Sequence, residues 1–319
     1  KEASLRHQSR LSIVSFFFVM VTTVLVGDAK VKLQGDPCFT LGKRLLVQEL
    51  LYADDTLVVD AEIGVVKAYM DYINTAGEQY GLQFNWSKLE VLPVRCSATL
   101  PMPDGKFVKQ KESMKYLGSI LAADGGISSE LGARLGAARA DYDKLARIWS
   151  HASISRHRKL QIFEACVISK LLYCIHVACL NVAELRKLDA FYVRCLRRIA
   201  GIQPSYYSRV SNQTVLETMK RKPLSTALER RQLLYIRHLA QLPDGNVLRD
   251  CVFENSTFTL RRHQGPRKRG RPRVTWGESV YNLAVSVAGG QHNFQRLWAS
   301  TPEAAMAWRA TVDQYYVHK

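Results

Sequence analysis

Two adjacent aspartates stand between short apolar runs, and this arrangement limits the fold more than any other stretch of the chain. Residues 50–59 read Leu-Leu-Tyr-Ala-Asp-Asp-Thr-Leu-Val-Val. The apolar residues at 45–47 and 50–51 are typical of one strand and those at 57–59 of a second, so a turn is expected at or near residues 53–56. The sequence therefore predicts a hairpin over residues 45–60 with Asp54 and Asp55 at its tip.

The paired carboxylates indicate metal chemistry. Two neighbouring acids repel each other, which costs stability unless a cation offsets the charge. Carboxylate oxygens suit Mg²⁺, with Mn²⁺ as the alternative, and two such ions about 3.5–4 Å apart would stabilise both oxygens of a phosphoryl transfer. A polar turn without function is the other interpretation, because Asp is common in turns.

Three blocks, in the family's order, resemble the reverse transcriptases of non-LTR (LINE-type) retrotransposons. Residues 50–57 resemble their catalytic hairpin. Residues 81–90 (Gly-Leu-Gln-Phe-Asn-Trp-Ser-Lys-Leu-Glu) resemble the next block of the palm, and residues 115–118 (Lys-Tyr-Leu-Gly) resemble the primer grip. The resemblance covers roughly residues 16–276. It implies an RNA-directed DNA polymerase, a nucleotidyltransferase that extends a primer 3′-hydroxyl.

The resemblance assigns roles to individual residues. It implies that Asp54 and Asp55 hold the metal and that Lys88 is also catalytic, near the triphosphate of the incoming deoxynucleotide. A lysine there would neutralise or protonate the leaving pyrophosphate, although Lys88 alone is equally consistent with a solvated surface lysine. The implied nucleotide- and primer-binding residues are Tyr52, Ala53, Asn85, Tyr116, Leu117 and Gly118.

The sequence departs from the family's pattern in two places. The family's third catalytic aspartate lies on a strand before an apolar palm helix, and here that strand and the fingers would precede Lys1. Residues 6–15 lack the glycine and the prolines of the family's loop. Asp28 is predicted to lie in a solvated turn. We therefore expect a carboxyl-terminal fragment that is inactive alone, and a catalytically dead nucleic-acid-binding module remains the alternative.

The apolar stretch at residues 11–26 has two interpretations. It is shorter than the roughly 20 residues of a membrane span and lacks a clear signal-peptide cleavage site. A buried helix of the palm is the prediction, and no membrane partner is expected. A membrane-attached basic protein is the alternative that rests on this stretch alone.

Cysteine usage predicts an intracellular protein, in the nucleus or the cytoplasm, that is not secreted. The chain has seven cysteines and no Cys-x-x-Cys pair. Four of them lie in apolar, helix-like surroundings, which predicts reduced and buried thiols; they are Cys166, Cys174, Cys179 and Cys195. The group formed by Cys174, His176 and Cys179 does not have standard zinc spacing.

The charge indicates a nucleic-acid partner. The net charge is +17, and residues 144–237 hold 18 Lys or Arg against 5 Asp or Glu. A polyanion such as an RNA template with a DNA primer or target fits this distribution. The expected contacts are Arg194, Arg197 and Arg198 on the polar side of a helix at 182–200, and Arg267, Lys268, Arg269, Arg271 and Arg273 in an extended loop.

The loop contains Arg-Gly-Arg-Pro at 269–272, which has two interpretations. The four residues match the core of an AT-hook, whose arginines enter an A·T minor groove. The same run also resembles a structural element of LINE-type carboxyl ends. Both interpretations remain open at this point.

The predicted fold class is α+β. Residues 1–125 would form a partial palm, an antiparallel sheet with packed helices, with the primer grip at 114–121. A basic, helical thumb or connection would follow at 126–242, then a basic linker at 243–275 and a small helical module at 276–319 with Trp298 and Trp308 in its core. Helices are predicted at 61–80, 128–145, 157–180 and 182–200, and strands at 91–94, 106–108 and 116–121.

Overall fold

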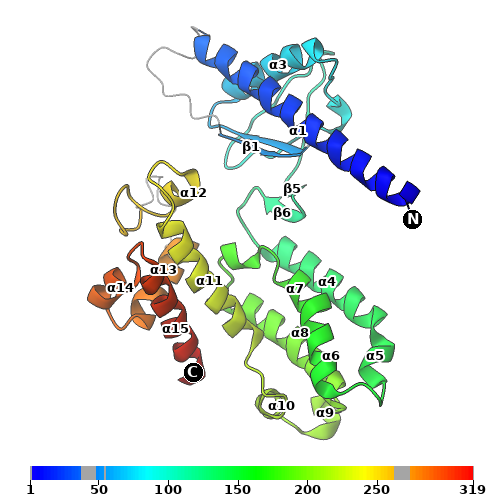
Figure 1. Ribbon diagram of the computed structural model, residues 1–319, viewed down its shortest axis with the longest axis vertical. Helices are drawn as coiled ribbons and strands as arrows, with labels where there is room; N and C mark the ends of the chain where they lie inside the picture. Colours follow the sequence, from blue (N-terminus) through cyan, green and yellow to red (C-terminus); the bar gives the residue numbers. More distant parts are fainter. Residues whose placement is uncertain (1, 37–47, 54, 262–273, 319) are drawn as a thin grey trace. The chain divides into compact units, whose positions relative to one another are not determined.

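The computed structural model describes residues 2–36, 48–53, 55–261 and 274–318. The chain divides into two compact units, Lys1–Gly126 and Ile127–Lys319, which Figure 1 colours from blue to cyan and from green to red. Unit 1 combines helices with small sheets, and the regular elements described in unit 2 are helices. This mixture confirms the α+β class.

Unit 1 holds three two-stranded sheets in its described part. The pairs β1–β2 and β5–β6 are antiparallel hairpins, and β3–β4 is parallel. The elements in chain order are α1 (Glu2–Gly35), β1 (Gln48–Tyr52), β2 (Asp55–Val59), α3 (Ile63–Gln79), a 3₁₀ turn (Trp86–Lys88), β3 (Glu90–Val91), β4 (Lys109–Gln110), β5 (Ser113–Tyr116) and β6 (Ser119–Ala122).

The core of unit 1 lies between α1 and α3. The helical spacing predicted at 61–80 is confirmed, because α3 buries residues three or four positions apart on one face. Val58 of β2 packs against the same cluster, so the first hairpin is anchored to this core. The buried residues are Leu25, Val26, Ala29 and Leu33 from α1 and Val65, Tyr69, Ile73 and Ala76 from α3.

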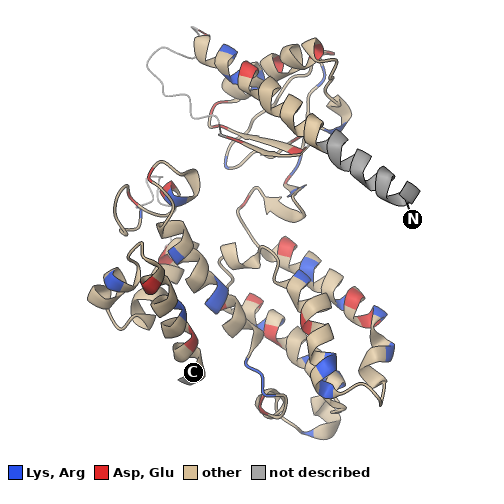
Figure 2. Ribbon diagram, in the orientation of Figure 1, with Lys and Arg blue, Asp and Glu red and all other residues tan. Residues whose placement is uncertain are grey.

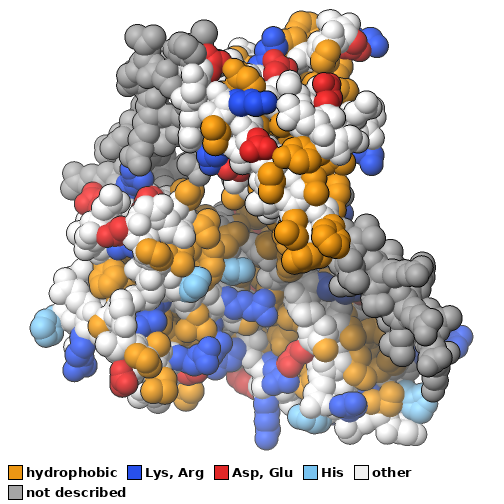
Figure 3. Space-filling view, turned by 45° about the horizontal axis from the view of Figure 1, so that its top comes forward, with side chains coloured by type: hydrophobic (Ala, Val, Ile, Leu, Met, Phe, Trp, Pro, Cys, Tyr) orange, Lys and Arg blue, Asp and Glu red, His pale blue; other side chains and the backbone are white. Residues whose placement is uncertain are grey.

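The apolar stretch of α1 is helical as predicted, but the prediction that it is buried is wrong for residues 16–20 and 24. Phe16 and Phe17 are 64% and 59% exposed, and apolar side chains gather on the surface beside the part of α1 drawn in grey (Figure 3). The buried residues of α1 that pack against α3 lie between 25 and 33, because apolar residues surround the helix and one face can pack. No described helix has the length and apolar character needed for a membrane crossing.

Three local predictions in unit 1 need correction. Asp28 lies within α1 rather than in a turn, and it accepts a hydrogen bond from the Tyr80 hydroxyl at 3.1 Å. The strands predicted at 91–94 and 106–108 are displaced to Glu90–Val91 and Lys109–Gln110. Between these two strands the chain turns where the Met102 amide donates to the Lys106 carbonyl at 2.7 Å.

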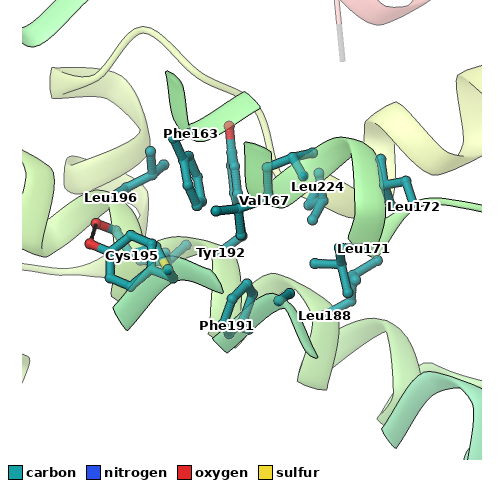
Figure 4. Packing of buried hydrophobic residues seen from close by; sticks show 14 of the residues in the cluster. Phe163, Val167, Leu171, Leu172, Leu188, Phe191, Tyr192, Cys195, Leu196 and Leu224 are labelled. Carbon is teal, nitrogen blue, oxygen red and sulfur yellow. Dashed lines mark hydrogen bonds between the residues drawn. The ribbon is translucent and has the colours of Figure 1, made fainter. Parts of the chain in front are cut away.

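The first part of unit 2 packs around α8 (Val182–Ala200), whose predicted bounds are confirmed. Asn181 and Glu184 form a reciprocal capping box at its start, and Gly201 ends it with φ +73°. Figure 4 shows Phe191, Tyr192 and Leu188 meeting side chains of neighbouring helices. The helices of this part are α4 (Ser128–Lys144), α5 (Ala146–Ser150), α6 (Arg156–Phe163), α7 (Ser169–Leu171), α9 (Ser205–Ser208) and α10 (Asn212–Thr218), and Leu224 and Leu228 join its core from a later helix.

The helix predicted at 157–180 is interrupted. It passes from α6 through a π-helical turn at Glu164–Ile168 into α7, and Cys174 then takes a left-handed conformation with φ +59°.

Among the six described cysteines only Cys195 is buried, while Cys166 and Cys179 are exposed and Cys174 is half-buried. The prediction of four buried thiols is therefore wrong for three of them.

The second part of unit 2 surrounds Trp298 and Trp308, and the prediction that both lie in a core is confirmed. Phe253 is also fully buried there, so residues 247–261, predicted as part of a linker, pack into this core instead. The elements are α11 (Leu224–Ala240), α12 (Val247–Asp250), α13 (Trp276–Val287), α14 (Gln291–Leu297) and α15 (Pro302–His318).

Candidate functional site

The β1–β2 hairpin positions the acidic motif. Tyr52 pairs with Asp55, and the two residues between them in the sequence are Ala53 and Asp54. Two-residue hairpin loops favour positive φ because their twist then matches that of the strands, and Ala53 has φ +53°. Asp54 lies outside the described residues, as do residues 45–47 of the predicted hairpin.

The outer surface of this hairpin is open to solvent. Leu50 and Tyr52 are 52% and 64% exposed, whereas Val58 packs against the core of unit 1. Asp55 is exposed at the start of β2. Within the described part of unit 1, no cation is paired with its carboxylate, so the oxygens of Asp55 are accessible to a ligand.

A second hairpin reaches the first through Tyr116. The Tyr116 hydroxyl donates to the Leu50 carbonyl at 3.0 Å. Desolvation raises the pKa of Tyr116, and the nearby charge of Asp55 raises it further. Tyr116 therefore lies close enough to the acidic motif to sense its charge, and it stays a neutral hydrogen-bond donor near pH 7.

The primer-grip segment is a turn rather than the single strand predicted over 116–121. Tyr116 ends β5 and Ser119 begins β6, and the two residues pair across the loop. Leu117 and Gly118 both have positive φ, at +47° and +77°, as two-residue loops of this kind require. A glycine in second position supplies the turn, although the surrounding apolar residues resemble a strand.

Lys88 and Asn85 lie in a separate segment of unit 1. Asn85 precedes the 3₁₀ turn that ends at Lys88, and both side chains are exposed. The Asn85 amide oxygen accepts from the Ser87 hydroxyl at 2.6 Å. No hydrogen bond or ion pair joins Lys88 to the acidic hairpin in the described structure.

Sequence reasoning missed a polar cluster that lies beside the β1–β2 hairpin. Glu49 of β1 forms an ion pair with Lys30 of α1 at 2.6 Å, and one of its oxygens is buried without a partner among the described residues. Burial, and then the charge of Glu49, raises the pKa of Tyr69 to about 12. A charged residue, Lys30, within the apolar helix was the one sign of this cluster in the sequence. Its partner Glu49 lies 19 residues away along the chain, so the sequence did not indicate the pair.

The predicted metal ligands are only partly among the described residues. No group of three or more His, Cys, Asp or Glu side chains among them is arranged to hold an ion. Asp55 supplies hard oxygen donors that suit Mg²⁺ or Mn²⁺, and Asp54 is adjacent to it in the sequence. The carboxylate oxygens of Asp54 and Asp55 are donors that fit the predicted metal. Glu49 is already in an ion pair with Lys30.

The predicted nucleic-acid contacts on α8 differ from one another. Arg194 and Arg198 are exposed, and Lys and Arg lie along most helices of unit 2 (Figure 2). Arg197 is only 7% exposed, so the prediction that it lies on the polar side of the helix is wrong. Its guanidinium donates to the Val210 carbonyl at 2.8 Å and to the Asn212 amide oxygen at 2.9 Å. Arg197 therefore fixes the segment that follows α8.

The remaining predicted contacts, Arg267, Lys268, Arg269, Arg271 and Arg273, lie outside the described residues. Comparison of the chain with protein-family models, with curated proteins and with solved structures found no match in any of the three sets.

Proposed function

We propose that the chain is part of an RNA-directed DNA polymerase of the non-LTR retrotransposon type, with unit 1 contributing a partial palm. The observation that carries the proposal is the contact between the two hairpins. Tyr116 of the primer-grip segment donates to the carbonyl of Leu50, on the strand that leads into the paired aspartates. Sequence resemblance assigned these two segments to one active site, and their contact supports that assignment.

The proposed roles follow from the chemistry of each group. Asp54 and Asp55 would hold Mg²⁺, which supplies charge stabilisation for phosphoryl transfer when it is bound. Tyr116, Leu117 and Gly118 would position the primer end through a rigid turn. Asn85 and Lys88 would face the incoming nucleotide, where a lysine charge favours the departing pyrophosphate.

The test is primer extension on an RNA template with Mg²⁺, together with Mn²⁺ binding measured by electron paramagnetic resonance. Asp55→Asn keeps the shape of the side chain and removes its charge. We expect it to lower Mn²⁺ affinity by at least about 100-fold, and to lower extension by the same factor if the chain extends the primer, since loss of residues that merely support a metal ligand costs 10–100-fold.

Asp104→Asn is the matched control, because Asp104 is an exposed turn aspartate of the same unit that accepts from the Lys106 amide at 3.0 Å. The control should leave both readouts unchanged. Equal Mn²⁺ affinity in wild type and Asp55→Asn would remove the metal site from the proposal. Mn²⁺ binding without extension would confine the proposal to a catalytically inactive chain.

Nucleic-acid binding without catalysis is the second candidate, and it rests on unit 2. Residues 144–237 carry 18 basic against 5 acidic residues, and Arg194 and Arg198 are exposed on α8. When binding depends on phosphate contacts, the logarithm of the association constant falls linearly with the logarithm of the salt concentration. The slope is roughly −0.9 for each contact. A duplex affinity that does not change across a salt series would contradict this candidate.

A further inference from the structure

A cavity lined by arginines opens in unit 2 between α4, α8 and the α9–α10 segment. Its volume is about 890 Å³, in the range of sites for small ligands. Four guanidinium groups line it against one carboxylate, that of Asp143, and the remaining lining is largely apolar. The four arginines are Arg139, Arg194, Arg197 and Arg198.

Arg197 is the fixed member of this group. Its Nη2 atom donates to Val210 and Asn212, which holds the guanidinium in place. Its Nη1 atom is buried and has no hydrogen-bond partner in the part of the chain that the structure describes. A guanidinium nitrogen can only donate, and a buried donor without an acceptor is costly. The Nη1 donor of Arg197 therefore lacks an acceptor among the described residues.

The other arginines are free to supply charge to a ligand. Arg194 is exposed. Arg198 forms a long ion pair with Asp143, at 3.7 Å, and lies over the Tyr142 ring at 5.9 Å, and the side chains of Arg198 and Asp143 are at least half exposed. Exposed pairs of this kind contribute little stability, so an anion of higher charge can displace Asp143 from Arg198.

We propose that this cavity binds a phosphate group, with Arg194 and Arg198 as mobile cations at its edge and Arg197 in its wall, where the approach of the anion must first uncover the sealed Nη1 donor. Arginine binds phosphate through paired N–H donors. A phosphate monoester carries close to two negative charges near pH 7, which matches a lining of four cations and one anion better than a carboxylate does. The phosphate would come from the end of a nucleic-acid strand or from a free phosphate.

The experiment compares two single-stranded oligonucleotides, one with a 5′-phosphate and one with a 5′-hydroxyl, both labelled at the 3′ end. Binding to the full chain is followed by fluorescence anisotropy in EDTA without deoxynucleotides, so the outcome is independent of polymerase activity. We expect the phosphorylated strand to bind roughly tenfold more tightly, the effect of one charge-assisted hydrogen bond.

Variants place this preference in the cavity. Arg194→Gln with Arg198→Gln removes mobile charge, and Ala190→Phe fills part of the lining without changing charge. Both should abolish the preference. Arg186→Gln, at an exposed position of α8 outside the cavity, should preserve it. Arg197→Lys keeps the charge but loses the paired donors and should also abolish it. If that variant fails to fold, Ala190→Phe decides.

Inorganic phosphate distinguishes the two sources. The cavity would be assigned to a free phosphate if the two strands bind equally and inorganic phosphate competes with them more strongly than sodium chloride at equal ionic strength. Ala190→Phe must then remove this competition. Equal strand affinities without such competition would overturn the proposal. A preference that survives Ala190→Phe would overturn it too, since the phosphate would then bind elsewhere.

Discussion

The Tyr116 hydroxyl donates a hydrogen bond to the Leu50 carbonyl across 66 residues of sequence. This bond joins the two hairpins of unit 1 at the strand that precedes the paired aspartates. Leu50 already pairs with Leu57 within the β1–β2 ladder, so Tyr116 bonds to a residue of the ladder itself. The order of the acidic hairpin therefore depends partly on a residue outside it.

Tyr116→Phe is expected to loosen the β1–β2 hairpin while leaving the global fold intact. The substitution removes a hydrogen bond worth about 1 kcal/mol, so amide exchange in β1 and β2 should quicken roughly fivefold. Hydrogen exchange measures this directly. Tyr52→Phe is the control, because the described structure gives the Tyr52 hydroxyl no partner. Unchanged exchange in Tyr116→Phe would show that the bond does not order the hairpin.

Two glycine-to-alanine changes in unit 1 should have opposite signs. Gly118 has φ +77°, so Gly118→Ala should lower the free energy of unfolding by about 1 kcal/mol, because an L residue is strained there. Gly64 lies in α3, where alanine favours the helix. Gly64→Ala should therefore raise the free energy of unfolding by up to about 1 kcal/mol. A Cβ atom at either position meets no atom within 4 Å. Urea unfolding gives both values. A rise for Gly118→Ala would refute the turn conformation, and a fall for Gly64→Ala would refute the prediction for α3.

Local periodicity predicted the elements whose packing follows from their own sequence. The apolar stripe of α8 and that of α3 repeat at helical spacing, and both helices form with those faces buried. The turn at Leu117–Gly118 was missed because Gly118 and Ser119 are only a short break between apolar residues. The exposure of Phe16 could not be foreseen, because hydrophobicity favours burial but does not supply a partner surface.

The candidate site was less predictable, because it depends on contacts distant in sequence. Resemblance singled out Tyr116, but its bond to Leu50 follows from the pairing of two separate hairpins. Arg197 was expected on the solvated face of α8, and it is buried because the chain after Gly201 returns to place Val210 and Asn212 beside it. Helical periodicity contains no information about such a returning segment.

Asp189→Ala should destabilise unit 2 through the start of α11. Asp189 of α8 accepts from the Ser225 amide at 2.8 Å and from its hydroxyl at 2.7 Å. No side chain at the N-cap, Pro223, serves this end of the helix. Loss of a carboxylate that caps a helix costs about 1 kcal/mol, and up to about 2 kcal/mol, which urea unfolding will measure.

Asp143→Ala is the matched control for this cap. Asp143 is an exposed acid of α4 with a single long ion pair, and its loss should change the free energy of unfolding by less than about 0.5 kcal/mol. Asp189→Asn should fall between the two, since its amide oxygen can still accept from Ser225. Equal stabilities of Asp189→Ala and Asp143→Ala would show that Asp189 does not cap α11.

His176 should make unit 2 less stable in mild acid. Burial, and then the positive charge of Arg231, lowers the pKa of His176 in the folded chain. Its ring meets Tyr235 edge-on at 5.0 Å, and its carbonyl accepts from the Trp276 indole at 2.9 Å. Below pH of about 6.5 the unfolded chain protonates this histidine and the folded chain resists. Stability is therefore full above that pH and falls as the pH drops towards the folded pKa.

The measurement is the free energy of unfolding in urea at a series of pH values from neutral to mildly acidic. His176→Phe should flatten the slope below pH of about 6.5, and the difference from wild type cannot exceed about 1.4 kcal/mol per pH unit for a single proton. His292→Phe, at an exposed position of α14, should keep the wild-type slope. Identical slopes for wild type and His176→Phe would mean that protonation of His176 is not coupled to folding, and the acid sensitivity would then belong to other titratable groups.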